Sequence, residues 1–373
     1  MSEKYVIGID LGGTNTVIGL VDVKGHILAK DDSIKTQAHP DIEEYTDSIA
    51  KVINKLAEEN GCVGKLEGVG IGAPMANYYT GEIVNAANLP WKGIVPLGWL
   101  IEKKTGLPTK VTNDANAAAI GEMKYGVAQG MKDFVYITLG TGVGSGIVAN
   151  GQLIYGHDGF AGELGHVTAP VLEGRSCGCG RTDCLETYAS ATGIVRTAKK
   201  WLVERDEPSI LRDVCINEIT SKMLFDAAIK GDKLANDIFE FTGKVLGEAF
   251  CNFIAFSAPE AIILFGGLAN AGELLLEPIR KHMNENVVFL WRDKVKVLKS
   301  SLPGADAAVL GASALGWKDK LIADITLIYR ADDVMSHHRP DKFNTVYMFV
   351  CSILVVSIFS SVKGNFFLKS AWC

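Results

Sequence analysis

Ile9-Asp10-Leu11-Gly12-Gly13-Thr14 opens a pattern that the chain repeats at Ile137-Thr138-Leu139-Gly140-Thr141-Gly142. In both copies a buried strand runs into a glycine-rich turn, and a second strand, a turn at Gly25 or Gly151 and a third strand follow. Two copies of one three-strand unit predict a duplicated fold whose halves face each other across a cleft. A chance likeness between two glycine-rich hairpins is the alternative interpretation.

The composition is that of an ordinary globular protein. At roughly 100 to 200 residues per domain, its 373 residues allow two or three domains. Charged residues at 21% and hydrophobic ones at 48% exclude wholesale disorder, collagen and a polytopic membrane protein. A net charge of −6 argues against a nucleic-acid-binding protein. Short Val- and Ile-rich runs alternate with amphipathic segments, as in residues 41–60 and 66–71, which predicts the α/β class.

The two ends of the chain lead to separate predictions. Strand-like residues begin at Tyr5 with no signal peptide before them, so we expect a cytoplasmic protein. Residues 318–373 depart from the pattern upstream, and we assign this tail no role. Its uncharged run from Val346 to Val362 lies at the lower edge of the roughly 17 to 25 residues that span a bilayer. We expect a non-native or poorly folded appendage, and a membrane anchor is the alternative interpretation.

Both glycine-rich turns have the composition of phosphate-binding loops. Glycine lets backbone N–H groups approach an anion, and Thr14 adds a hydroxyl donor. The residues concerned are Gly12, Gly13 and Thr14 in the first turn and Gly140, Thr141 and Gly142 in the second. Neither the lysine of a P-loop nor the helix of a dinucleotide-binding motif follows. Each turn alone is accounted for as a tight hairpin, whereas the pair favours nucleotide phosphates.

Two aspartates lie at strand ends. Asp10 closes the first strand, where a carboxylate is costly to desolvate unless a cation such as Mg²⁺ compensates for it. Capping of the following turn is the alternative. Asp114 lies between a short strand and an Ala-rich helix, and we predict that it is the general base that accepts a proton from an alcohol. Asn113 would hold neighbouring hydroxyls, and helix capping by either residue is the alternative.

One histidine and three cysteines have the character of a structural zinc site. The residues are His166, Cys177, Cys179 and Cys184. Thiolates and imidazole suit Zn²⁺, and the glycines between and after the first two cysteines permit close spacing of the ligands. Free thiols are the alternative. Glu163 and Glu186 flank this cluster, and their acceptor-only carboxylates suit sugar hydroxyls, although ordinary surface glutamates would look the same.

In this order, the motifs resemble the ROK family of bacterial sugar kinases over about residues 5–317. Further matching stretches are Gly70-Ile71-Gly72-Ala73-Pro74 and Gly266-Gly267. The resemblance implies an actin-like, ribonuclease-H-like ATPase fold, with two α/β domains and mixed sheets around a central cleft. It also implies a small domain of residues 1–114, completed by a C-terminal helix at about 305–317. Residues 115–304 would form the large domain with the zinc loop.

The resemblance implies an ATP-dependent kinase that phosphorylates a hexose at its 6-hydroxyl, with glucose as the expected substrate and Mg²⁺ and structural Zn²⁺ as cofactors. It makes Asp114 the catalytic base and gives His166 a second role toward the sugar. The sugar ligands that it implies are Asn88, Asn113, Asp114, Glu163, His166 and Glu186. Gly266 and Gly267 resemble the adenosine-binding motif. Members of the family commonly form homodimers or homotetramers.

Two positions depart from the family pattern, because Met75 and Asp183 stand where glycine is usual. The first weakens the assignment of the sugar, so an N-acetylmannosamine or other amino-sugar kinase stays open. A sugar-sensing regulator without a DNA-binding domain is the alternative from another class. Regulators of this family carry a winged helix-turn-helix before the first phosphate loop, and only nine residues precede Asp10 here.

Overall fold

The structure is a computed structural model that describes residues 3–304 and 306–317. It contains two five-stranded sheets of the same mixed topology. In each sheet three strands that are consecutive in the chain pair antiparallel, and two later strands extend the sheet in parallel. The predicted duplication is therefore confirmed. The tail, with its run from Val346 to Val362, lies outside the described residues.

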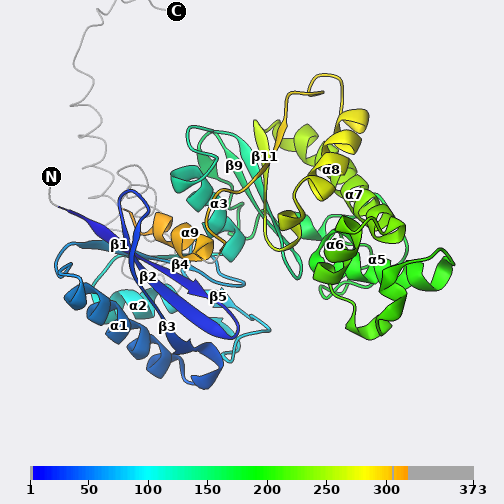
Figure 1. Cartoon of the computed structure of the whole chain (residues 1–373). Helices are drawn as coiled ribbons and strands as arrows, with labels where there is room; N and C mark the ends of the chain where they lie inside the picture. Colours follow the sequence, from blue (N-terminus) through cyan, green and yellow to red (C-terminus); the bar gives the residue numbers. More distant parts are fainter. Residues whose placement is uncertain (1–2, 305, 318–373) are drawn as a thin grey trace, which may run out of the picture. The chain divides into compact units, whose positions relative to one another are not determined.

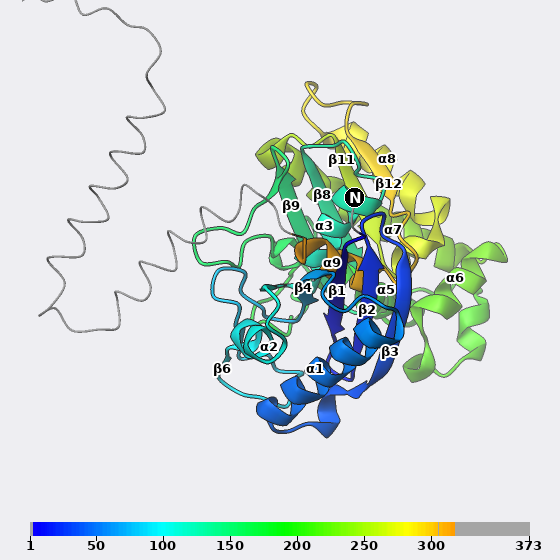
Figure 2. The same cartoon turned by 90° about the vertical axis from the view of Figure 1, so that its left-hand side faces the viewer.

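The first sheet has the strand order β3-β2-β1-β4-β7. Its strands are β1 (Tyr5–Leu11), β2 (Asn15–Asp22), β3 (Ile27–Lys35), β4 (Leu66–Gly72) and β7 (Thr109–Thr112). Buried aliphatic side chains of β1 and β4 form one core with α1 (Ile42–Glu59) and α2 (Leu97–Thr105), which lie beside this sheet in Figures 1 and 2. A small separate sheet pairs β5 (Ile83–Val84) with β6 (Ile94–Val95).

The second sheet has the strand order β10-β9-β8-β11-β12. Its strands are β8 (Phe134–Leu139), β9 (Val143–Ala149), β10 (Gln152–Leu153), β11 (Ala261–Phe265) and β12 (Lys296–Lys299). The helices of this half are α4 (Glu186–Ala189), α5 (Ala191–Glu204), α6 (Ser221–Ile229), α7 (Lys233–Ser257) and α8 (Glu273–Asn286). Their apolar faces share a core with β8, β9 and β11, and the second glycine-rich turn follows directly on β8.

Two helices of small residues connect the halves. α9 (Ala307–Leu315) lies directly on β1 and β4, because a Cβ at Gly8 or Gly70 would overlap a carbonyl oxygen of the helix. α3 (Asp114–Tyr125) packs against β8 and β9. It crosses α9 where the Cβ position of Gly121 lies 2.7 Å from the Cα of Gly311. Close packing of this kind transmits small displacements, because interiors have few voids.

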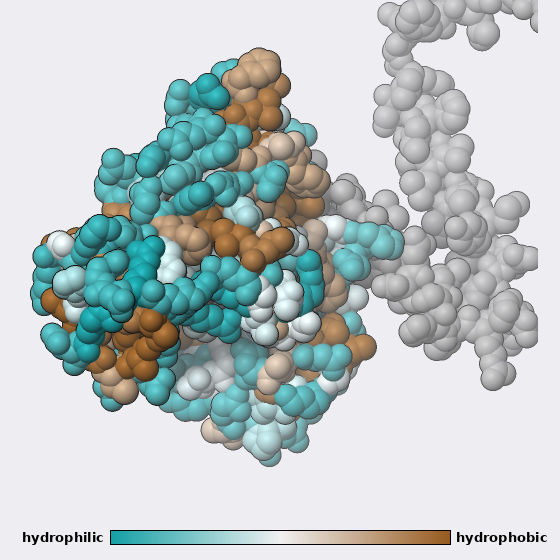
Figure 3. All heavy atoms as spheres, turned by 90° about the vertical axis from the view of Figure 1, so that its right-hand side faces the viewer, coloured by the Kyte–Doolittle hydropathy of each residue, from teal (hydrophilic) through white to brown (hydrophobic). Residues whose placement is uncertain are grey.

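The surface over α5 to α8 is mostly hydrophilic, with hydrophobic patches between (Figure 3). Exposed apolar side chains on these helices include Val203, Ile229 and Phe256. Within the described part of the chain, every helix is too short or too polar to cross a bilayer.

Candidate active site

The first glycine-rich turn is held through its carbonyl groups. Thr36 lies in the short helical turn η1 (Thr36–Ala38), and its hydroxyl donates to Gly12 O at 2.8 Å while its amide donates to Thr14 O at 3.0 Å. Gln37 Nε2 donates to Gly13 O at 2.6 Å. The C=O and N–H of a trans peptide point in opposite directions, so the amides of Gly13 and Thr14 point away from this support. Neither amide has a partner among the described residues, which leaves both available to an anion.

The second turn is built in the same way from a different element. Ala191 N at the start of α5 donates to Gly140 O at 2.8 Å, and the Thr192 hydroxyl donates to Thr141 O at 2.7 Å. The amides of Thr141 and Gly142 therefore point away from α5, and no described residue accepts from them. A simple hairpin does not need its turn carbonyls to be held by another element. This geometry therefore favours two anion-binding turns over two simple hairpins.

Asp10 and Asp114 face each other across the end of the first sheet. In the β1–β4 pairing, Asp10 lies opposite Gly72, whose Cβ position is 3.6 Å from the Cα of Asp114. Burial, reinforced by the charge of Asp114, raises the pKa of Asp10 to about 6. The Asp114 side chain reaches solvent, yet the surrounding protein atoms desolvate it enough to raise its pKa as well. Within the described chain no cation affects the pKa of either carboxylate, so a Mg²⁺ ion at Asp10 fits the charge of the site.

Helix capping at the start of α3 is real, but it uses only part of each side chain. Ala115 N donates to Asn113 Oδ1 at 2.9 Å and to Asp114 Oδ1 at 2.7 Å. The amide nitrogen of Asn113 and the second oxygen of Asp114 have no hydrogen-bond partner among the described residues. Capping therefore orients both side chains and leaves one atom of each for a ligand.

The three cysteines and His166 come together as the sequence predicts. Their donor atoms all lie within 4.8 Å of one another. Cys177 Sγ is 3.7 Å from His166 Nδ1, and Cys179 Sγ is 3.6 Å from Cys184 Sγ. A tetrahedral zinc ion with bonds of about 2.3 Å to sulfur requires donors about 3.7 Å apart. The donor set and its spacing therefore fit a closed zinc site.

Glu186 joins this cluster to the second phosphate turn. Its Oε1 lies 3.0 Å from Cys177 Sγ, and its Oε2 accepts from Val143 N at 3.4 Å. Glu163 lies just before the helical turn η2 (Leu164–His166). Burial raises the pKa of Glu163; His166 opposes this shift, and the charges of Asp114 and Glu186 reinforce it. The predicted base and three of the predicted sugar ligands thus lie within electrostatic reach of one another.

Asn88 lies instead against the first phosphate turn. The Cβ position of Gly13 is 3.0 Å from Asn88 O and 3.1 Å from Asn88 Nδ2, so a larger residue at 13 would displace it. Gln37 Nε2 donates to Asn88 O at 2.9 Å.

The predicted adenosine motif, Gly266-Gly267, packs against the end of the strand that leads into the second glycine-rich turn. Gly266 has φ +102°, and its Cβ position lies 2.6 Å from Leu139 O, so only glycine fits there. Gly267 borders open space. The two glycines therefore serve different purposes, which their adjacency in the sequence does not indicate.

The two departures from the family pattern share one backbone conformation. Met75 has φ +54° and Asp183 has φ +55°, in the left-handed region that glycine occupies without strain. Asp183 offsets the strain through its carboxylate, which accepts from the amides of Glu173, Gly174 and Arg175 at 2.8 to 3.2 Å. This aspartate therefore folds the loop that leads into the cysteine cluster.

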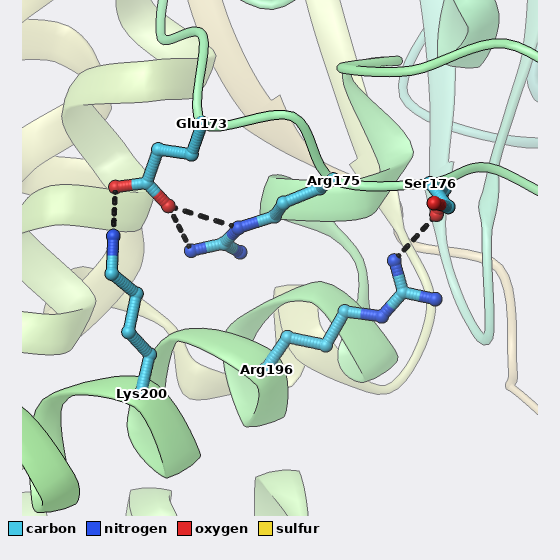
Figure 4. A pocket seen from close by; sticks show the side chains of 5 residues that line it. All are labelled: Glu173, Arg175, Ser176, Arg196 and Lys200. Atoms are coloured by element: carbon cyan, nitrogen blue, oxygen red, sulfur yellow. Dashed lines mark hydrogen bonds and ion pairs between the residues drawn. The ribbon is translucent and has the colours of Figure 1, made fainter.

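Charged side chains hold the same loop on α5 around a cavity of about 360 Å³ (Figure 4). Glu173 binds Lys200 at 2.8 Å and Arg175 at 2.9 Å. Arg175 also donates to Thr187 O at 3.1 Å, and Arg196 donates to Ser176 O at 2.9 Å. These contacts fix the cysteine cluster relative to the helix that supports the second turn, and spacing in the sequence gives no sign of them.

A second set of contacts that the sequence did not reveal connects the segment after β4 with the segment after β10. The rings of Tyr78 and Tyr155 stack with centroids 3.9 Å apart. Asn77 Nδ2 donates to Asp158 O at 2.6 Å, and the Tyr79 hydroxyl donates to Gly156 O at 2.8 Å. The segment that leads to Glu163 is thereby held against the first half of the molecule.

Comparison with known proteins agrees with this geometry. The model of the ROK family matches residues 6–319. A glucokinase of Halalkalibacterium halodurans is 38% identical over 320 residues, which cover 85% of this chain and 95% of that protein. A crystal structure of a ROK family glucokinase from Streptomyces griseus with glucose and AMPPNP superposes with a TM-score of 0.67 at 36% identity, covering 84% of this chain and 99% of that one.

A xylose repressor of Caldicellulosiruptor bescii is also similar, at 30% identity over 85% of this chain and 79% of that protein. The predicted actin-like fold class is confirmed by the likeness to the solved glucokinase. Since the family match runs through both phosphate turns, the start of α3 and the cysteine cluster, this chain belongs to the ROK family.

Proposed function

We propose that this protein transfers the γ-phosphoryl group of ATP to the 6-hydroxyl of a hexose, with glucose as the substrate. The observation that carries the proposal is the pair of turns with outward amides, set around two aspartates that have no cationic partner in the described chain. The glucokinase names of similar proteins, and the glucose and AMPPNP in the solved relative, support the choice of sugar and donor.

Asp114 is the proposed general base, because it is accessible and one of its oxygens has no described partner. Its raised pKa makes Asp114 a stronger base, which favours transfer of the hydroxyl proton to it. Asp10 would hold Mg²⁺, which neutralises phosphate charge during transfer. Gly12, Gly13 and Thr14, together with Gly140, Thr141 and Gly142, would bind phosphates through their amides. Gly267, beside Gly266, would border the adenosine.

The sugar would be held on two sides. Asn113, Glu163, His166 and Glu186 gather near Asp114 and the cysteine cluster, and Asn88 lies against the first phosphate turn. Carboxylates and amides accept and donate to neighbouring hydroxyls, which fits a polyol. Zinc held by His166, Cys177, Cys179 and Cys184 would be structural, fixing His166 and Glu186 in place.

The division into a small domain of residues 1–114 with α9 and a large domain of residues 115–304 belongs to this proposal. Contacts of α9 with β1 and β4 support the placement of that helix in the small domain. A homodimer or homotetramer is proposed as well, because members of the family commonly form them. Light scattering on the full chain tests the oligomeric state.

A sugar-responsive regulator is the second candidate function, because a xylose repressor is similar over most of this chain. A coupled ADP-release assay on the full chain separates the two, with Mg-ATP and with glucose, mannose, N-acetylglucosamine or N-acetylmannosamine in separate samples. A response to glucose alone supports the proposed function. A response to an amino sugar alone preserves the mechanism and changes the substrate. Binding of sugar without turnover contradicts the kinase and favours the regulator.

A further inference from the structure

Gln37 makes two hydrogen bonds with one side-chain nitrogen. Its Nε2 donates to Gly13 O at 2.6 Å and to Asn88 O at 2.9 Å. A primary amide nitrogen carries two hydrogens, so both donors are used. Gln37 is exposed to solvent, so these contacts fill no core position and serve no packing need.

The first of these bonds sets the direction of a phosphate-facing amide. The peptide that joins Gly13 to Thr14 has its C=O held by Gln37, and its N–H therefore points to the opposite side of the turn. Thr36 holds the two neighbouring carbonyls, so the amide of Thr14 depends on Gln37 in particular.

The second bond joins this turn to the connection between β5 and β6. Asn88 lies in the connection between β5 and β6, and its exposed side-chain amide has no partner among residues 3–304 and 306–317. Its backbone touches the first turn, and Gln37 Nε2 is the donor that links its carbonyl to that turn. A displacement of Asn88 therefore reaches the turn through the Gln37 side chain, in addition to its direct contact with Gly13.

We propose that Gln37 is a positioning residue that couples the segment of Asn88 to the first phosphate turn, so that hexose and Mg-ATP strengthen each other's binding. The inference rests on the proposed function, since it takes Asn88 as a sugar contact and the turn as a phosphate site. It adds the residue through which one site affects the other. By thermodynamic linkage, the effect of sugar on nucleotide affinity equals the effect of nucleotide on sugar affinity.

The test uses three variants of the full chain. Gln37→Met keeps the length of the side chain and removes both donors, whereas Gln37→Lys supplies donors again. Gln129→Met is the matched control, because Gln129 is also exposed and donates to one backbone carbonyl, Lys124 O at 2.7 Å, outside both turns. Calorimetry gives the Kd of glucose without nucleotide and at saturating Mg-AMPPNP, and the ratio of the two is the coupling. Coupled assays give kcat, both KM values and ADP release without sugar.

We expect the wild type and Gln129→Met to bind glucose more tightly when Mg-AMPPNP is present. In Gln37→Met this coupling should fall by about fivefold, the factor that corresponds to one net hydrogen bond. The KM for ATP should rise by a similar factor, and the Kd of glucose without nucleotide should stay the same. The rate of ADP release without sugar should increase relative to the rate of phosphoryl transfer to glucose. Gln37→Lys should recover at least part of the coupling.

Three results would overturn the inference. The first is coupling in Gln37→Met equal to that of the wild type. The second is an equal weakening of both substrates together with a lower melting temperature, which is the mark of a purely structural role. The third is an active wild type without coupling. A wild type that phosphorylates none of the sugars would instead contradict the proposed function itself, and this inference with it.

Discussion

Glu186 and Gly142 are in direct contact, although one follows the cysteine cluster and the other lies in the second phosphate turn. A Cβ at position 142 would lie 2.5 Å from Glu186 Oε2, which is closer than real Cβ contacts come. The other carboxylate oxygen of Glu186 lies 3.0 Å from Cys177 Sγ. The geometry of the cysteine cluster and that of the turn therefore depend on each other through one side chain.

Gly142→Ala tests this contact. The added methyl group must push the Glu186 carboxylate away. Because this carboxylate is the end of a flexible side chain, the fold should change little, whereas a proposed sugar ligand is displaced. We expect kcat/KM for glucose to fall by about tenfold, which corresponds to the loss of about 1.4 kcal/mol of hydrogen bonding to the substrate. Gly304→Ala is the control, because the Cβ position of Gly304 meets no atom within 4 Å. Equal kinetics in the two variants would contradict the contact.

Removal of the proposed zinc should loosen the same connection. Cys179→Ser removes one of the four donors, and Cys215→Ser is the control, because Cys215 is exposed and lies outside the cluster. We expect elemental analysis to show about one zinc per chain in the control and a loss of zinc in Cys179→Ser. The melting temperature should fall and the KM for glucose should rise in the same variant. Full activity in a zinc-free protein would contradict a role of the metal in holding His166 and Glu186.

Asp10→Asn should stabilise the ligand-free protein at pH 7 while it abolishes turnover. The folded-state pKa of Asp10 is raised from 3.8 to about 6, so the folded state binds more protons than the unfolded state between these values. Stability therefore falls as pH rises from about 4 to 6, and the loss, on the order of 3 kcal/mol, is fully present at pH 7. Denaturant unfolding at pH 4 and pH 7 measures this. A variant that is less stable than the wild type at pH 7 would contradict the pKa shift.

Asp114→Asn should lower kcat by about a hundredfold to ten-thousandfold, the range of general-base catalysis, with little change in the Kd of glucose. Because burial raises the pKa of Asp114, activity of the wild type should be lost on the acid side at a pH above the ordinary aspartate value of 3.8. The pH dependence of kcat at saturating substrates measures this. Near-normal turnover in Asp114→Asn would refute the assignment of the base.

Alanine at Gly266 and at Gly267 should have different effects. At Gly266 the left-handed backbone and the nearby Leu139 carbonyl make alanine destabilising by about 1 to 3 kcal/mol, visible as a lower melting temperature. At Gly267 alanine meets no protein atom, so the fold should be unchanged. A raised KM for ATP in Gly267→Ala would then report contact with the nucleotide. The same KM as in the wild type would place the adenosine elsewhere.

The sequence was sufficient to predict the elements that depend on local chemistry. The repeat of strand, glycine-rich turn and strand predicted two sheets of one topology. Such a prediction is possible because a strand and a turn are each specified by a few neighbouring residues. The cysteine cluster was predicted correctly for a similar reason, since three of its four donors lie close together in the chain. Asp114 was placed at the start of α3 from the change of period alone.

The partners of these motifs were decided by the tertiary structure. Gln37 beside Asn88, Glu186 on Gly142 and Tyr78 stacked on Tyr155 join segments that are far apart in the sequence. No periodicity or propensity encodes such pairs, because they form only when packed elements bring two loops to one place. The sequence thus determined which residues form the local motifs, because their signals act between near neighbours, and the packing of the two halves decided which of these motifs touch one another.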